Sequence, residues 1–362
     1  MGFAKDVGDN GAALSRRQIL QRAALGAAAI ASMQGPLSGQ STSSGAAQAA
    51  AQRKYPPIPS WNTELHMLAP NVFAYTQASG PGVDNASLSN AGLIVGDDLL
   101  AIDALGPPVH AKAFIATAQK ATGKKFGRLL NTHHHRDHTN GNCFFLPAEI
   151  VSHEYARQAV IDQGLPAHPY ADRPQWQEGM NELKLAPPST TFSERMTYRY
   201  RDLVVEAIYN GPAHTWGDVM VYLPQHKILF AADIAFFYVT PSGQNGHITK
   251  WMEAIDRIMK MDVDVIVPGH GPLGTKKELA ETRAYFETLV PEVQKKYKLG
   301  MTVGEAAANL ELGRFANWTN PERNVLNTLR LYAEFNGTLT PEIDVAGTDR
   351  ALAEYNAILK KR

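Results

Sequence analysis

Short apolar runs and stretches with helical spacing alternate along most of this chain. From residue 66 to 104 the apolar runs are brief and bounded by turn residues, which is typical of β-strands, and a helix is expected near Val109 to Thr122. Downstream, the pattern predicts strands at 128–132, 149–152, 198–209, 219–223 and 228–232 and helices at 153–162 and 249–261. Two halves, each with strands followed by a helix, predict an α/β fold and fit an αβ/βα sandwich.

Beyond residue 280 the pattern becomes mostly helical. Asn320 and Pro321 are a favourable N-cap and first-turn pair. The apolar stripe that follows ends near Asn336 and Gly337 and consists of Val325, Leu326, Leu329, Tyr332 and Ala333. We therefore expect a C-terminal helical extension at 281–362 that packs on a domain spanning 54–280. A substrate lid or a dimer surface would leave the same stripe, so the sequence does not choose among these roles.

The N-terminal region has the features of an export signal. The segment Ser15–Leu20 (S-R-R-Q-I-L) matches the twin-arginine pattern, and the small apolar residues of Ala23–Met33 follow it. These eleven residues are too few for a stable membrane anchor. With a plausible cleavage site at Ala47–Ala49, residues 1–49 are expected to form a twin-arginine signal peptide and flexible linker. The mature bacterial protein would then be periplasmic or secreted; a basic tail is the alternative.

Composition favours a soluble globular enzyme. The 35 basic and 35 acidic residues balance, so nothing indicates a nucleic-acid partner. Cys143 is the single cysteine of the chain, which excludes an internal disulfide, and we interpret it as a small buried residue. Neither feature predicts an oligomeric state.

Four of the twelve histidines fall within six consecutive residues, where the pattern H-x-H-x-D-H supplies His133, His135, Asp137 and His138. The imidazoles repel one another when protonated, whereas a cation binds neutral imidazole and ionised carboxylate. On extended backbone, residues two apart point the same way, so the first three share one side. His134 has the opposite parity and is expected to support a ligand or to lie on the surface. The cluster therefore predicts a metal site.

Three more residues elsewhere are candidate ligands. His214 lies in the motif G-P-A-H-T and His270 in P-G-H-G, both of them loops rich in glycine or proline. Asp233 closes the apolar run that begins at Ile228, where an aspartate acts either as a cap or as a ligand. Nitrogen and oxygen ligands suit zinc, with other first-row metals possible.

The order of these motifs resembles the metallo-β-lactamase superfamily of hydrolases, over about Lys54 to Ala280. The resemblance implies a four-layer αβ/βα sandwich with two Zn²⁺ ions per chain, iron or manganese being alternatives. By position it assigns ligands as follows: His133, His135 and His214 to the first metal, Asp137, His138 and His270 to the second, and Asp233 to both. It further implies that Asp103, which closes the strand at 99–102, orients a ligand histidine.

The resemblance implies a dinuclear zinc hydrolase of the glyoxalase-II-like branch. It would cleave an ester, thioester, lactone or related acyl bond of a small molecule by attack of metal-bound hydroxide, with Asp137 passing the proton to the leaving group. A class B-type β-lactamase and a mononuclear iron persulfide dioxygenase are the alternatives, and a non-catalytic metal-binding role is disfavoured. The aspartate at position 233 argues against thiolate-type lactamases, and the full ligand set argues against the dioxygenase.

Evidence on the substrate is indirect. A loop at 77–85 is expected to overhang the metals, and the polar insert at 163–195 carries Tyr170 and Trp176. Three aromatic residues, Phe236, Phe237 and Tyr238, soon follow the aspartate at 233. Together they favour an apolar or aromatic substrate. No cluster of arginine or lysine near the motifs indicates a polyphosphate or nucleotide.

Overall fold

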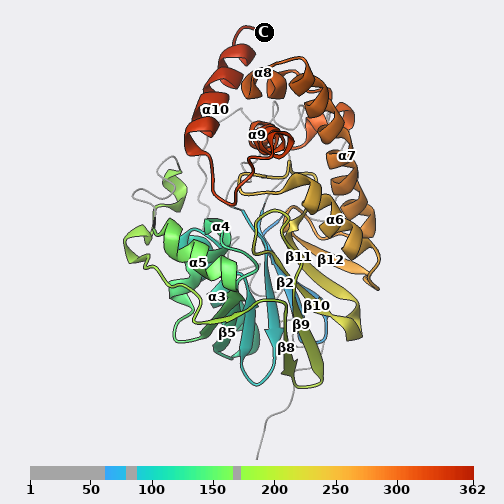
Figure 1. The fold of residues 1–362 in the computed structure, drawn as a ribbon. Helices are drawn as coiled ribbons and strands as arrows, with labels where there is room; N and C mark the ends of the chain where they lie inside the picture. Colours follow the sequence, from blue (N-terminus) through green and yellow to red (C-terminus); the bar gives the residue numbers. More distant parts are fainter. Residues whose placement is uncertain (1–61, 79–87, 166–172) are drawn as a thin grey trace, which may run out of the picture.

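The computed structural model describes residues 62–78, 88–165 and 173–362, and Figure 1 shows two β-sheets with helices outside both of them. The expected signal peptide, most of the loop at 77–85 and Tyr170 lie outside these residues. None of the helices within the described residues combines the length and the apolar character required to cross a membrane.

The first sheet has seven strands in the order of the sequence. Neighbouring strands pair antiparallel from the first strand to the fourth and parallel from the fourth strand to the seventh. The strands are β1 (Glu64–Ala69), β2 (Val72–Thr76), β3 (Ala91–Val95), β4 (Leu99–Ile102), β5 (Phe126–Leu130), β6 (Glu149–His153) and β7 (Thr190–Phe192). Helices α3 (Pro108–Thr122) and α5 (Glu154–Gln163) pack against this sheet.

The second sheet has five strands in the order β12-β11-β10-β9-β8, with β11 and β12 parallel. These strands are β8 (Arg195–Tyr200), β9 (Leu203–Tyr209), β10 (Val219–Leu223), β11 (Ile228–Phe236) and β12 (Val265–His270). Helices α6 (Ile248–Met259) and α7 (Lys276–Lys298) lie outside it. Because β8 and β9 form a hairpin, the single stretch expected at 198–209 is two strands.

The remaining helices are short or belong to the C-terminal region. Short turns of helix occur at α4 (Arg136–Thr139), η2 (Asn140–Phe144), η3 (Pro174–Trp176), η4 (Met180–Glu182), η5 (Pro224–His226) and η6 (Gly313–Asn317). The C-terminal helices are α8 (Val303–Ala308), α9 (Arg323–Asn336) and α10 (Val345–Leu359).

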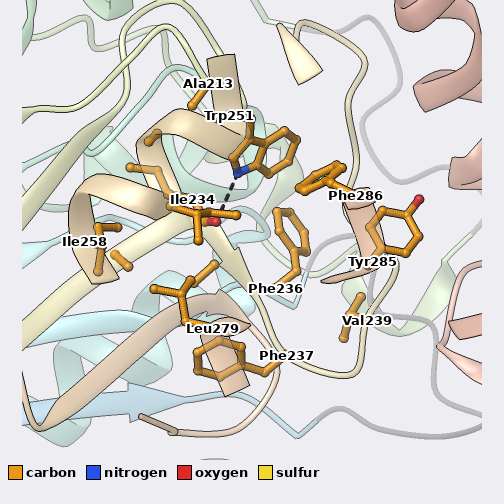
Figure 2. Packing of buried hydrophobic residues seen from close by; sticks show 14 of the residues in the cluster. Ala213, Ile234, Phe236, Phe237, Val239, Trp251, Ile258, Leu279, Tyr285 and Phe286 are labelled. Carbon is orange, nitrogen blue, oxygen red and sulfur yellow. Dashed lines mark hydrogen bonds between the residues drawn. The ribbon is translucent and has the colours of Figure 1, made fainter. Parts of the chain in front are cut away.

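Three apolar layers hold the four-layer sandwich together, which confirms the predicted fold. Side chains such as Ile94 and Val221 fill the space between the sheets, and Phe114 of α3 packs on the outer face of the first sheet. In the third layer, shown in Figure 2, the Trp251 indole N–H donates to the Ile234 carbonyl at 3.0 Å. A buried indole with a satisfied N–H adds a large apolar surface without a polar penalty.

The C-terminal helices differ in detail from the expectation. Helix α7 runs through residue 280, so the domain boundary expected there falls inside a helix. Asn320 has φ 57° and precedes a turn, and α9 begins only at Arg323 with Glu322 as its N-cap. The predicted Asn320 cap is therefore wrong, because a residue in the left-handed region cannot present the extended N-cap backbone. Gly337 ends α9 in the left-handed conformation, as expected.

We predict that Phe114→Ala lowers the free energy of unfolding by about 3–5 kcal/mol, because a large ring leaves a cavity in a close-packed layer. The Phe114 ring is fully buried, and its centroid lies 5.0 Å from that of Tyr75. Urea denaturation measures the loss. The exposed Lys120→Ala on the same helix is the control and should change stability by no more than about 0.5 kcal/mol. Equal effects of both variants would contradict the assignment of this layer as core.

Candidate metal centre

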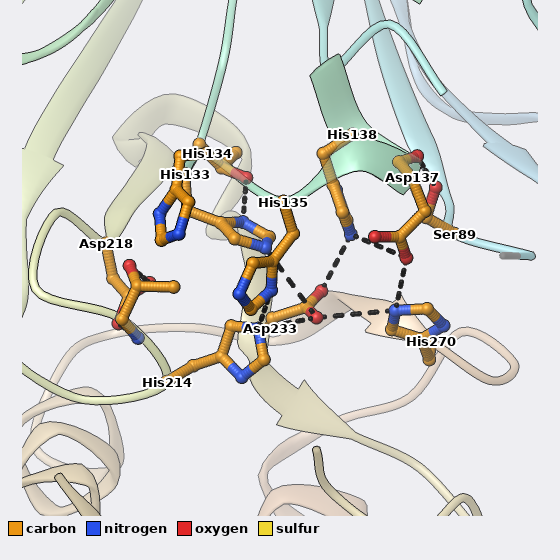
Figure 3. Close-up of polar contacts among 12 residues, drawn as sticks. Ser89, His133, His134, His135, Asp137, His138, His214, Asp218, Asp233 and His270 are labelled. Carbon is orange, nitrogen blue, oxygen red and sulfur yellow. Dashed lines mark hydrogen bonds and ion pairs between the residues drawn. The ribbon is translucent and has the colours of Figure 1, made fainter. Parts of the chain in front are cut away.

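The candidate ligands lie close together, as Figure 3 shows. His133 to His138 follow the end of β5, His214 lies between β9 and β10, Asp233 lies within β11 and His270 is the last residue of β12. Strands of both sheets therefore deliver side chains to the same place.

Four of these residues form a first group whose ligand atoms all lie within 4.8 Å of one another: His133, His135, His214 and Asp233. All four are buried. His135 Nδ1 lies 2.8 Å from His214 Nε2, and the latter lies 3.1 Å from Asp233 Oδ2. Three imidazole nitrogens and one carboxylate oxygen are a donor set that zinc accepts.

Asp137, His138 and His270 form the second group. His270 Nε2 lies 3.2 Å from Asp137 Oδ2, and His138 Nε2 lies 3.6 Å from the same oxygen. Asp233 also reaches this group, because its Oδ1 lies 3.0 Å from His138 Nε2. One carboxylate thus contacts members of both groups, which is the arrangement of a residue shared by two metals.

The turn after β5 explains how adjacent residues serve different groups. His135 has extended backbone, but α4 begins at the next residue and turns the chain. Asp137 and His138 therefore face the second group. The expectation that Asp137 shares a side with His133 and His135 is wrong, since strand alternation ends where the helix begins.

Backbone geometry fixes Asp233 and His270. Ala232 has φ 45°, and the pairing register of β11 shifts there, so Asp233 lies inside the strand and does not close it. Gly269 packs directly on this carboxylate: a Cβ at that position would lie 1.8 Å from Asp233 Oδ1. Gly271 has φ 96°, a conformation that favours glycine. Both glycines of the P-G-H-G motif are therefore required by the site.

Asp103 has the contact expected of it. Its Oδ2 lies 2.8 Å from His138 Nδ1, while its Oδ1 accepts from the Thr132 backbone N–H at 2.8 Å. A buried carboxylate beside Nδ1 keeps the proton there and leaves Nε2 free for a metal. Asp103 therefore orients His138.

Asn245 orients His135 as Asp103 orients His138, and this residue was not predicted from the sequence. Its side-chain oxygen lies 2.9 Å from His135 Nε2, so the proton belongs on Nε2 and Nδ1 faces His214 with a lone pair. The Asn245 amide donates to the Pro341 carbonyl at 2.8 Å and so joins a metal ligand to the C-terminal region. Asn245 follows β11 in an irregular segment, and no sequence pattern marks it.

Two further supports were also missed. Asp218 accepts from the Thr215 backbone N–H at 2.8 Å and from the Thr215 hydroxyl at 2.6 Å, which shapes the loop that carries His214. The Asn90 amide donates to the Pro268 carbonyl at 2.9 Å beside His270. The sequence around His214 continues as G-x-x-H-T-x-x-D, and the aspartate that ends this motif could have predicted the role of Asp218.

His134 is buried but belongs to neither group of candidate ligands. Its ring makes an edge contact with Tyr155, and its carbonyl accepts from the Gln163 amide at 2.7 Å. The alternative that His134 lies on the surface is therefore wrong. Its ring packs beside that of His135, with the ring centroids 4.7 Å apart. Cys143 is only half-buried, which corrects the expectation of a buried thiol.

Burial and the donor set fit a bound cation. Among the described residues, His133 Nε2 is buried without a hydrogen-bond partner, and it points towards Asp233 at 3.9 Å from Oδ2. Leaving such a nitrogen unpaired in the interior costs free energy. A metal at this point would satisfy it. The residues present therefore fit the metals that the sequence predicts.

The two groups differ in their protonation. Burial lowers the pKa of His135 to about 3 and lowers the pKa of His133 well below its usual value. Burial also opposes protonation of His138, but nearby carboxylates, first that of Asp233, outweigh it and raise its pKa well above the usual value. The pKa of His270 is raised for the same reason. Protons therefore compete with a metal mainly at the second group.

Residues 84–270, just over half of the 362 residues, match the sequence profile of the metallo-beta-lactamase superfamily. The chain belongs to this superfamily. Members of this superfamily are metal-dependent hydrolases, and this chain has a buried group of histidines and an aspartate that could hold a metal.

Individual relatives are distant. The chain is 25% identical to the 2,4-dinitroanisole O-demethylase subunit alpha of Nocardioides sp. (strain JS1661), over 48% of this chain and 49% of that protein. It is 24% identical to metallo-beta-lactamase type 2 of Bacillus cereus, over 60% of this chain and 80% of that protein. The structure of the stereoselective inverting sec-alkylsulfatase Pisa1 from Pseudomonas sp. matches with a TM-score of 0.56 at 18% identity, over 76% of this chain and 50% of that chain. The chain thus spans about half of the demethylase subunit and of the alkylsulfatase.

We predict that the second group loses its metal at a higher pH than the first. A raised pKa keeps His138 and His270 protonated up to a higher pH, and a metal must displace those protons. Protein loaded with two equivalents of zinc at pH 8 should retain about one equivalent after dialysis to mildly acidic pH. Metal quantification across the pH range measures this. Loss of both metals at the same pH would contradict the difference between the groups.

We further predict that Asn245→Ala weakens metal binding by about 10–100-fold, because the proton on His135 Nε2 loses its acceptor. Asn245→Asp keeps an acceptor oxygen but removes the amide N–H that reaches Pro341. It should therefore retain metal affinity within a few-fold. Chelator competition gives the affinity, and the Co²⁺ absorption spectrum reports the coordination. Unchanged affinity in the alanine variant would show that the contact does not orient His135.

Proposed function

We propose that the protein is an exported dinuclear zinc hydrolase that cleaves an ester, thioester, lactone or related acyl bond of a small molecule. The observation that supports it best is the position of Asp233, which lies between the two groups of ligands and contacts both. A site with seven ligands and a shared carboxylate matches two metals better than one.

Bound zinc would lower the pKa of a water molecule to about 7 and polarise the scissile bond. The protein contributes rigidity, because Asp103 and Asn245 hold His138 and His135 in one orientation each. Buried walls exclude bulk water and strengthen every charge interaction within the site. These are the conditions under which an oxyanion is stabilised during hydrolysis.

Asp137 is the residue we assign to proton transfer. Its side chain is 16% exposed, whereas that of Asp233 is 3% exposed, so Asp137 is the carboxylate that faces outward. Burial opposes its ionisation, but His138 and His270 outweigh this and lower its pKa. It is therefore ionised at neutral pH and ready to accept a proton and pass it to a leaving group.

Export remains part of the proposal on the basis of the twin-arginine pattern at Ser15–Leu20. The twin-arginine machinery would carry the folded, metal-loaded chain to the periplasm or beyond. Comparing the mass of the protein from whole cells with that from the periplasmic fraction would locate the cleavage site.

A β-lactam is the second candidate substrate. The alignment with the Bacillus cereus lactamase, which includes 80% of that protein, favours it. A lactam differs from a lactone of the same ring in having nitrogen in place of oxygen as the leaving atom, so the same residues would serve both reactions. The names of the other two relatives add an aryl methyl ether and a sulfate ester to the set worth assaying.

A substrate panel tests the proposal directly. Purified mature protein, with its metal content measured, is assayed on p-nitrophenyl esters, thioesters, lactones, nitrocefin, 2,4-dinitroanisole, alkyl sulfates and a phosphodiester. We expect two zinc ions per chain and highest kcat/KM on an acyl substrate. Highest efficiency on nitrocefin would establish the second candidate, and one iron with oxygen uptake on a persulfide would overturn both.

We predict that Asp137→Asn lowers kcat by about 10²–10⁴-fold on the best substrate, because an amide cannot accept the proton. Metal content is measured on the same sample, and added zinc restores any lost occupancy. Glu154→Gln, an exposed carboxylate on α5, is the control and should leave kcat unchanged. Full activity of the asparagine variant with both metals bound would remove Asp137 from the mechanism.

A further inference from the structure

One side of α9 carries polar side chains in the interior of the protein. Arg323, Asn327, Arg330 and Glu334 follow one another at spacings of four, three and four residues, so they share one side of the helix. The first three residues are buried, and the side chain of Glu334 is 7% exposed. A helix usually turns an apolar stripe to the core, because buried polar groups cost free energy unless they are hydrogen-bonded. We call these four residues the polar face of α9.

The polar face bonds to the segment 240–249, which leads from β11 into α6. At the start of this segment, Arg323 donates to the Thr240 carbonyl at 3.0 Å, and Asn327 donates to the Pro241 carbonyl at 2.9 Å. Backbone groups outside strands and helices need partners from elsewhere when they are buried. The first two members of the polar face provide such partners.

Arg330 and Glu334 hold the other end of the segment. Arg330 Nε donates to the Gly246 carbonyl at 2.7 Å, while its terminal nitrogens donate to two carbonyls in the linker between α9 and α10. The Glu334 carboxylate accepts from the Thr249 hydroxyl at 2.7 Å and from backbone N–H groups at the start of α6. His247, the N-cap residue of α6, makes no side-chain cap bond. A carboxylate of another helix therefore caps α6.

The same segment also contacts the regions of two ligands in the first group. The side-chain oxygen of Asn245 lies 2.9 Å from His135 Nε2. Two residues later, the backbone N–H of His247 donates at 2.8 Å to the carbonyl of Ala213, the residue that precedes His214. The segment is thus bonded to α9 on the one hand and to the surroundings of two imidazoles on the other.

We propose that the polar face of α9 positions His135 and His214 through the segment 240–249, so that the C-terminal helical region is part of the metal centre. Its four members act through the segment and are positioning residues. The second group is oriented by Asp103, which follows β4 and bonds to His138. We therefore expect α9 to set the metal affinity of the first group and not that of the second. This inference rests on the metals of the proposed function but not on the bond that they cleave.

Variants with one group of ligands removed test the proposal separately at each metal. His270→Ala disables the second group, and His214→Ala disables the first. Arg330→Met is introduced into each of these proteins, and Co²⁺ affinity is measured at pH 8 by chelator competition while the visible spectrum is recorded. We expect the first group to bind about tenfold more weakly with an altered spectrum, and the second group to change by less than about twofold. Equal weakening of both groups, or no weakening, would overturn the proposal.

Glu334→Gln is a milder second variant, because it keeps an acceptor oxygen and loses the charge. It should weaken the first group a few-fold and spare the second, and it decides the question alone if Arg330→Met does not fold. Tyr332→Phe is the matched control on the same helix. Its hydroxyl donates to the Met301 carbonyl at 2.9 Å, so the variant removes a bond that does not reach the segment. An equal loss of first-group affinity in the control would contradict the proposal.

A double-mutant cycle distinguishes positioning from a general loss of stability. If Arg330 acts through Asn245, then Arg330→Met should add little once the asparagine is gone. The double variant should bind the first metal within about twofold of Asn245→Ala alone, because residues that act in one network are not additive. Effects that multiply in full would contradict the proposed route.

The result is separable from that of the substrate panel. If the variants behave as expected and no acyl substrate is cleaved, the proposed function fails while the role of α9 stands. Cleavage of an acyl substrate, together with unchanged first-group affinity in Arg330→Met and Glu334→Gln, would give the reverse conclusion. Unmodified protein that binds no Co²⁺ would overturn both.

Discussion

The buried carboxylate of Asp233 is the group on which the rest of the site depends. Its two oxygens lie within 3.3 Å of nitrogens from His138, His214 and His270, which come from three separate parts of the chain. Burial penalises the charge of Asp233, but these imidazoles outweigh the penalty and lower its pKa well below the usual value. The two sheets must be packed together before these imidazoles can surround Asp233. Formation of the fold therefore also assembles the site.

Much of this arrangement could be predicted from the sequence. The pattern H-x-H-x-D-H and the histidines at 214 and 270 identified the candidate ligands, because those residue types in Gly/Pro loops have few structural roles. The supports of the ligands were harder to predict. Asp103 followed from the resemblance, but Asn245 stands in an irregular segment and contacts His135, which lies 110 residues earlier in the chain. Tertiary hydrogen bonds of this kind have no local periodicity.

Local conformation explains the other differences. The prediction that side chains alternate from His133 to Asp137 is wrong because a one-turn helix begins at Arg136. The prediction of an N-cap at Asn320 is wrong because the backbone of this residue is left-handed. Phe236 stacks on His270 at 7° between the ring planes, and Phe237 lies in the core. These aromatics, which suggested an apolar substrate, are buried packing residues.

The order of these parts along the chain has a consequence for how the protein matures. Every candidate ligand has been synthesised by residue 270, whereas the Pro341 carbonyl that accepts from the Asn245 amide lies in the C-terminal region. Arg330 of α9 likewise donates to the Gly246 carbonyl, which precedes it in the sequence, and to the Glu342 carbonyl, which follows it. During translation the metal ligands are therefore complete before the contacts that join residues 245–246 to the C-terminal region can form.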